Sequence, residues 1–168
     1  MEKGQESTVI NYPYLPTGRT ILYVPASNTF MQAARDFALE HSLDDAVKTG
    51  SVVVKDGVII GHAANGSEYH RTHTCERVRL GIPTGQGYEL CEGCHPKNHS
   101  ERGAIADAQA HGHDVSGADL YLWGHWWACE PCWSAIIEAD IAQVYLMEGS
   151  EVLFNKSDPA NILGRLSS

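Results

Sequence analysis

Two short motifs about 30 residues apart constrain the fold of this chain more than any other feature. The first reads His99-Ser100-Glu101, and the second reads Cys129-Glu130-Pro131-Cys132. Imidazole nitrogens and thiolates are preferred ligands of Zn²⁺, and three such ligands leave the fourth position of a tetrahedral site open, as in catalytic zinc sites. We therefore predict that the fold brings the two motifs together around one zinc ion.

Both motifs lie where helices are predicted to begin. The segment from His99 to His111 reads as a helix that ends at Gly112, and Pro131 lies in the first turn of a helix predicted to run to Ala139. The N-terminus of a helix carries a partial positive charge, which favours the thiolate form of a cysteine and lowers its pKa. Two helix N-termini that converge on one zinc ion would therefore form a suitable metal site.

The remaining elements predict an α/β fold, a three-layer α-β-α sandwich with a mixed central sheet. A helix is expected from Asn28, a hairpin over residues 50–64 around the turn Asp56-Gly57, and strands at 119–123 and 142–147. The apolar residues of the hairpin are nearly continuous, which predicts a sheet covered on both faces. The apolar face of the first helix is expected to contain Phe30, Ala33, Ala34, Phe37, Ala38 and His41.

The length of 168 residues is that of one domain. We expect residues 1–28 to form an N-terminal extension with one added strand at 21–24, and residues 29–168 to form a single domain. Residues 65–98 are rich in Gly, Pro, His and Cys and have no periodicity. A loop of this length in a compact domain needs its own stabilisation or a function, so we expect an insertion there.

The two motifs and the preceding hairpin resemble the cytidine and deoxycytidylate deaminase superfamily over roughly residues 30–147. The resemblance is closest to the deoxycytidylate deaminase branch. It implies a zinc-dependent hydrolase that releases ammonia from the cytosine of a free nucleotide or nucleoside, as in the conversion of dCMP to dUMP. In such deaminases one His and two Cys hold the zinc, and the Glu moves protons without being a ligand. By this resemblance His99, Cys129 and Cys132 are the zinc ligands, and Glu101 is the general acid and base.

The resemblance also implies which residues contact the substrate. Asn65 follows the second strand of the hairpin, where deoxycytidylate deaminases carry an Asn that contacts the nucleoside, although a turn Asn before a glycine is an equally simple explanation. The family usually has Pro immediately before the first Cys, whereas this chain has Ala128. The carbonyl that precedes this position usually meets the expelled amino group, and Trp127 would supply it here. The departure at Ala128 bears on the substrate rather than on metal binding.

A second cysteine cluster lies within residues 65–98. Cys75, Cys91 and Cys94 with one histidine would close a tetrahedral site without an open position, which is typical of structural zinc. His73 is the first candidate for the fourth ligand, and His70 is the alternative. Related deoxycytidylate deaminases often carry an extra zinc in this region. The other interpretation is that the three thiols are free.

The net charge of −9 argues against a polymeric nucleic acid as partner, because phosphate neutralisation by basic residues supplies much of that affinity. Five of the twelve basic residues nevertheless lie in one 32-residue window. They could hold a small anionic substrate, or they could simply be solvated surface charge. These residues are Arg71, Arg77, Arg79, Lys97 and Arg102.

No membrane span is expected, because the chain has no apolar run of 18 residues. The first residues also lack the pattern of a signal peptide. Four of the five cysteines form Cys-x-x-Cys pairs, which in a chain that is not exported favours metal binding over disulfides. We therefore expect a cytoplasmic protein, and the family resemblance implies a homo-oligomer.

Two other functions remain open. A deaminase of guanine or another nucleobase would share both motifs. A non-catalytic zinc module would instead use Cys91, Cys94, Cys129 and Cys132 as one four-thiolate site. The spacing opposes this module, since 34 residues separate Cys94 from Cys129, against about 15–20 in ribbon patterns. It would also leave His99 without a role.

Overall fold

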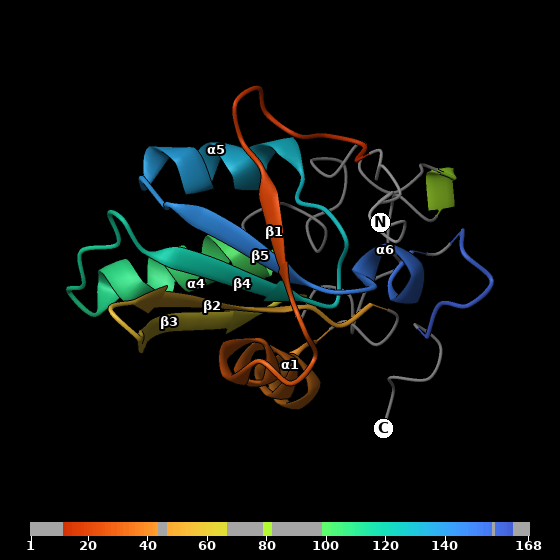
Figure 1. Ribbon diagram of the computed structural model, residues 1–168, viewed down its shortest axis with the longest axis horizontal. Coiled ribbons are helices and arrows are strands. Elements are labelled where there is room, and N and C mark those ends of the chain that lie inside the picture. The colour runs from red at the N-terminus through yellow and green to blue at the C-terminus, as the bar shows by residue number, and fades with distance from the viewer. Residues whose placement is uncertain (1–11, 44–46, 67–78, 82–98, 156, 163–168) are drawn as a thin grey trace, which may run out of the picture.

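The computed structural model describes residues 12–43, 47–66, 79–81, 99–155 and 157–162 of the chain. Within these residues five strands form one sheet in the order β1-β5-β4-β2-β3, and helices cover both of its faces (Figure 1). The elements are β1 (Ile21–Val24), α1 (Thr29–His41), β2 (Gly50–Lys55), β3 (Val58–Ala64), α4 (Ser100–Ala110), β4 (Asp119–Trp123), α5 (Glu130–Glu138), β5 (Gln143–Met147) and α6 (Ser150–Leu153).

The sheet is mixed, as the sequence predicts. β2 is antiparallel to both β3 and β4, whereas β4, β5 and β1 are parallel to one another. Gly50, the first residue of β2, pairs with Ala64 at the end of β3 and with Trp123 at the end of β4. β3 and β4 therefore run in the same direction, and their carboxyl ends lie at one edge of the sheet, on either side of the start of β2.

β2 lies between β4 and β3 in the sheet and contributes to two hydrophobic cores. Val52 and Val54 belong to the core under α1, and Val53 belongs to the core on the opposite face, under α4 and α5. Successive side chains of a strand point to opposite faces, so a strand covered on both sides is apolar throughout. The prediction of a doubly covered strand is confirmed for β2. It is wrong for β3, an edge strand in which Val58 is 59% and Ile59 is 37% exposed.

Two glycines allow the helices to lie directly on the sheet. A Cβ atom at Gly50 would lie 2.3 Å from the carbonyl oxygen of Ala34 in α1, and a Cβ atom at Gly61 would lie 2.4 Å from the carbonyl oxygen of Ala104 in α4. Cβ atoms do not approach backbone oxygens so closely, so a side chain at either position would push the helix away. The close seat of α4 on β3 brings its N-terminus to the sheet edge where β3 and β4 end.

The predicted start of α1 and the predicted turn between β2 and β3 are both confirmed by the structure. Asn28 Oδ1 accepts hydrogen bonds from the amides of Phe30 and Met31, each at 3.0 Å, and so caps α1. Asp56 and Gly57 both have positive φ angles, 52° and 78°. A two-residue hairpin turn of this kind requires left-handed backbone at both positions, which explains the Asp-Gly pair.

Other features depend on tertiary packing and were expected incompletely. β1 is the strand anticipated within residues 1–28, and it pairs in parallel with β5 and contributes Ile21 to the core. The buried face of α1 includes Met31, whereas His41 is exposed, contrary to the predicted face. The short helix α6 was not predicted. None of the helices in the described part of the chain is long and apolar enough to cross a membrane.

Replacement of Gly61 by Ala tests the close packing of α4 on β3. The new methyl group would overlap a backbone oxygen that cannot move by itself, so we expect G61A to lower the free energy of unfolding by about 1–3 kcal/mol. Urea unfolding followed by circular dichroism measures this change. Val58→Ala, an exposed substitution in the same strand, serves as the control and should change the free energy by about 0.5 kcal/mol or less. Equal stability of G61A and V58A would contradict the close contact.

Candidate metal centre

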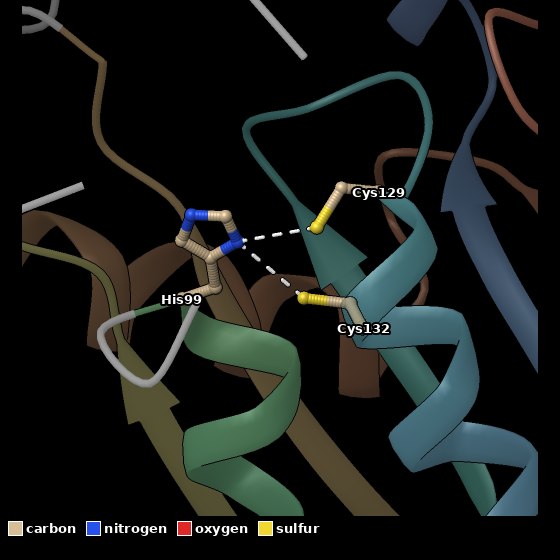
Figure 2. A group of neighbouring side chains, drawn as sticks. All are labelled: His99, Cys129 and Cys132. Atoms are coloured by element: carbon tan, nitrogen blue, oxygen red, sulfur yellow. Dashed lines mark hydrogen bonds between the residues drawn. The ribbon is translucent and has the colours of Figure 1, made fainter. Parts of the chain in front are cut away.

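His99, Cys129 and Cys132 come together at the N-termini of α4 and α5. His99 is the N-cap residue of α4, Cys129 is the N-cap residue of α5, and Cys132 lies in the first turn of α5. Figure 2 shows the three side chains pointing toward one another between the two helix ends. Neither His99 nor Cys129 caps its own helix with its side chain. The imidazole and the thiol are therefore directed into the shared group instead.

The separations between the donor atoms fit a tetrahedral zinc site. His99 Nδ1 lies 3.4 Å from the Sγ atom of Cys129 and 3.4 Å from that of Cys132. Zinc bonds of about 2.3 Å to sulfur and about 2.0 Å to nitrogen, at a tetrahedral angle, place these atoms about 3.5 Å apart. Among the residues that the structure describes, this is the one group of His, Cys, Asp and Glu side chains whose donor atoms are gathered closely enough to hold a metal ion.

The two cysteines differ in how readily they lose their protons. Hydrogen bonding with Cys132 and with His99 lowers the pKa of Cys129 to about 5, although burial acts in the opposite direction. The same pairing with Cys129, together with burial, raises the pKa of Cys132. One thiolate thus forms readily and the second proton is retained until a cation replaces it. Binding of zinc to such a pair releases that proton, because both sulfurs must be thiolates as ligands.

Glu101 lies beside the donor group without belonging to it. Its side chain is only 6% exposed, in the first turn of α4, two residues after His99. Burial raises the pKa of Glu101 to about 6, while the nearby His99 acts to lower it. A carboxyl whose pKa has moved toward neutrality can both accept and return a proton, which is the property needed of a general acid and base.

Two buried hydroxyl groups support this carboxyl. Ser51 of β2 and Ser100 of α4 are both fully buried, and their Oγ atoms lie 2.8 Å apart. Ser100 also donates a hydrogen bond to Glu101 Oε1 at 3.4 Å. The sequence predicted a role for neither serine. The position of Ser100 inside the first motif was an available signal, whereas Ser51 becomes relevant only through the packing of α4 on the sheet.

Asn65, a predicted substrate contact, is held at the end of β3 by its own side chain. Asn65 Oδ1 accepts hydrogen bonds from the amide of Thr49 at 2.9 Å and from the hydroxyl of Ser42 at 2.5 Å. Asn65 Nδ2 donates to the carbonyl of Val47 at 2.7 Å. In the described part of the chain, these bonds occupy both acceptor positions of the amide oxygen and one of its two N–H donors. Asn65 can therefore offer a ligand one N–H group.

The loop from Gly124 to Ala128 connects β4 to α5 and contains the other predicted substrate contacts. Gly124 has a φ angle of 97°, and a Cβ atom there would lie 2.1 Å from the carbonyl oxygen of Lys48, so only glycine is accommodated. Trp127 is 6% and Ala128 is 2% exposed, and they immediately precede Cys129. The structure thus places both residues next to the metal group, in a loop packed against the chain that leads into β2.

Several predicted residues lie outside the part of the chain that the structure describes. They are the candidate ligands of the second zinc and three basic residues, namely His70, His73, Cys75, Cys91, Cys94, Arg71, Arg77 and Lys97. The second zinc therefore stays a prediction. The other two basic residues of the 32-residue window are described: Arg79 is exposed and Arg102 is partly buried. Arg102 lies in the first turn of α4, next to Glu101, and its positive charge acts to lower the pKa of Cys132.

Zinc content distinguishes the three ligands from Glu101. Replacement of His99, Cys129 or Cys132 by Ala removes one of three donors, so we expect each variant to lose one equivalent of zinc per chain. Glu101→Gln should retain it, because the carboxyl is not a donor. Metal analysis by mass spectrometry after dialysis against a mild chelator measures these contents. Retention of the full zinc content by C132A would contradict the assigned site.

The family comparison agrees with this geometry. Residues 25–148 match the cytidine and deoxycytidylate deaminase zinc-binding region. No curated protein matches the chain at a significant level.

The solved structures that are similar to this chain include deaminases of different compounds. A dCMP deaminase from the cyanophage S-TIM5, in complex with dCMP and dUMP, is 23% identical over 82% of this chain and 89% of its own, with a TM-score of 0.48. A guanine deaminase from Bacillus subtilis is 24% identical over 70% of this chain and 61% of its own, with a TM-score of 0.43.

A diaminohydroxyphosphoribosylaminopyrimidine deaminase and reductase from Thermotoga maritima is 28% identical over 70% of this chain, with a TM-score of 0.45. This chain spans only 28% of the length of that protein. The region matched by the family extends over most of the present chain and contains His99, Glu101, Cys129 and Cys132. On this basis the chain belongs to the cytidine and deoxycytidylate deaminase zinc-binding family, with a His-Cys-Cys zinc site.

Proposed function

We propose that this protein hydrolytically deaminates the cytosine of a free nucleotide or nucleoside, with a nucleotide such as dCMP as the preferred substrate. The observation that carries the proposal is the buried carboxyl of Glu101 beside the group formed by His99, Cys129 and Cys132. A structural zinc site does not need a buried carboxyl beside it. Burial of a carboxyl costs free energy of folding unless the group has strong partners, so a buried carboxyl without them indicates a function.

Each residue of the centre has a role in this reaction. When bound, zinc would act as a Lewis acid that lowers the pKa of a bound water to about 7. Glu101 would accept one proton from the attacking water and deliver it to N3 of the ring as the water oxygen bonds to C4. Glu101 would then take the remaining proton of that oxygen and give it to the amino group, so that the C4–N bond breaks, ammonia leaves and C4 becomes a carbonyl. Ser100 donates a hydrogen bond to the carboxyl of Glu101, and its hydroxyl is paired in turn with that of Ser51.

The substrate would be oriented by residues at the same edge of the sheet. Asn65 would donate its remaining N–H group to an acceptor on the nucleoside, and the carbonyl of Trp127 would accept a hydrogen bond from the amino group that is expelled. Ala128 would line the pocket between Trp127 and the first cysteine ligand. The rigid attachment of Asn65 to the chain before β2 supports this role, since an oriented donor discriminates better than a mobile one.

The family resemblance and the local positive charge favour a nucleotide over a free base. Arg102 lies in the first turn of α4, three residues after His99, and its positive charge would attract a phosphate. The net charge of −9 supports a small substrate rather than polymeric nucleic acid. We also propose a cytoplasmic location, a homo-oligomer and a single domain over residues 29–168, which the same resemblance and the use of cysteine support.

Ammonia release from a panel of compounds tests the reaction and its substrate. The panel contains dCMP, CMP, deoxycytidine, cytidine, cytosine, guanine and adenosine, and we expect dCMP to be turned over fastest. Glu101→Gln keeps the shape of the side chain and removes its base, so kcat should fall by about 10²- to 10⁴-fold while zinc stays bound. Turnover of guanine instead would identify the alternative deaminase. A wild-type protein that contains zinc and deaminates no member of the panel would refute the proposal.

We further propose a second, structural zinc held by Cys75, Cys91, Cys94 and His73, with His70 as the alternative fourth ligand. The donor chemistry of three thiols and one imidazole supports it. Cys91→Ser should remove one equivalent of zinc and lower Tm, because a structural metal contributes its binding free energy to folding. The equivalent lost on Cys132→Ser should be a different one, so the double variant should contain no zinc. Loss of the same single equivalent in both variants would favour one four-thiolate module.

A further inference from the structure

The loop that precedes the first cysteine ligand is organised by a histidine outside the metal group. His125 Nδ1 accepts a hydrogen bond from the backbone amide of Trp126 at 3.0 Å and a second one from the amide of Trp127 at 3.3 Å. The ring of His125 also contacts the indole of Trp127 edge-on, with centroids 5.8 Å apart and an angle of 69° between the planes. One imidazole thus holds two consecutive peptide groups.

This arrangement restricts the chemistry of the imidazole. A ring nitrogen that accepts hydrogen bonds must be unprotonated, so the proton of neutral His125 is on Nε2. The geometry is that of an Asx turn, in which the side-chain oxygen of Asn or Asp accepts from the amide two residues later. The Oδ1 atom of an asparagine can occupy the place of His Nδ1 in such a turn, whereas a leucine of similar size offers no acceptor.

The loop requires such a constraint because its own sequence supplies little rigidity after Gly124. Ala128 has no ring to restrict its backbone, in contrast to a proline at that position. Yet Trp127, Ala128 and Cys129 are all buried, at 6%, 2% and 7% exposure. The chain must therefore pass from β4 to the metal ligand along one defined path. Gly124 fixes the start of this path against Lys48, and Cys129 fixes its end.

We propose that His125 is a positioning residue: its Nδ1 atom holds the Trp126 and Trp127 amides so that the Trp127–Ala128 peptide keeps one orientation beside Cys129 and meets the reacting amino group of the substrate. The second half of this statement rests on the proposed deaminase function. The first half, the fixed turn, stands on the two hydrogen bonds and the burial of the loop. His125 contacts neither a reacting atom nor zinc in this role.

Three variants of the full-length, zinc-loaded chain test the role of the acceptor. His125→Leu removes the acceptor and keeps an apolar side chain, His125→Asn restores an acceptor, and His113→Leu changes an exposed histidine beyond the opposite end of α4. Exchange of the Trp126 and Trp127 amides, followed by NMR, reports on the turn without any substrate. In H125L each of the two amides loses its hydrogen bond to the side chain of residue 125, so both should exchange about three- to tenfold faster than in wild type. The rates should be those of wild type in H113L and close to them in H125N.

Kinetics on the compound of the panel that wild type deaminates fastest then test the consequence for turnover. We expect kcat of H125L to fall about tenfold or more with KM changed less than threefold, because a misdirected carbonyl acts mainly on the departing amine. H125N should recover kcat to within about threefold, and zinc content should be equal in all variants. An unchanged kcat in H125L, or an equal loss of kcat in H125N and H125L, would overturn the proposal.

The two arms separate this proposal from the deaminase function. If wild type deaminates no compound of the panel, the proposed function fails, and the positioning of a reacting carbonyl fails with it. The amide exchange then still decides whether His125 fixes the turn. Unchanged exchange of both amides in H125L would refute that part as well, whatever the activity of the wild-type protein.

Discussion

The antiparallel pairing of β2 with both of its neighbours is the constraint on which the metal centre depends. Because β3 and β4 pair with the same strand in the same sense, they run in one direction and end on either side of Gly50. α5 begins a few residues after β4, and α4 lies along β3 with its N-terminus at that edge. The partial positive charges of two helix ends therefore face one small volume, where they favour the thiolates that bind a cation.

A polar cluster inside an apolar core accompanies this arrangement. Glu101, Ser51 and Ser100 are buried near the core that contains Leu120, Leu122 and Ile136. Buried polar groups are tolerated when they are hydrogen-bonded, and the contact between the two serine hydroxyls meets that condition across the interface of helix and sheet. The same burial that disfavours ionisation gives the Glu101 carboxyl a pKa near that of a useful acid and base. In the proposed reaction, the catalytic capacity of Glu101 and the local cost of its burial would thus have one physical origin.

Much of this structure was predictable because its signals are local. The cap at Asn28 and the turn at Asp56-Gly57 depend on a few neighbouring residues, and both are confirmed. The metal ligands were predictable for a different reason, since histidine and paired cysteines have few other roles at that spacing. The exposure of Val58 and Ile59 at the start of β3 was predicted wrongly, because apolar residues in a strand do not reveal how far the covering helices extend along it. Ser51 and His125 were missed, since each acquires its role from a contact that no motif records.

The sequence by itself determined the ligand types, the family and the alternation of helices and strands, because these follow from side-chain chemistry and from short-range backbone preferences. Only the tertiary structure decided at which end of the strands the centre lies, how deeply Glu101 is buried, and which groups the side chain of Asn65 bonds to. Those properties depend on distances between segments far apart in the chain. They are set by the pairing of the strands and by the packing of α4 against Gly61. No local sequence pattern encodes a distance between such distant segments.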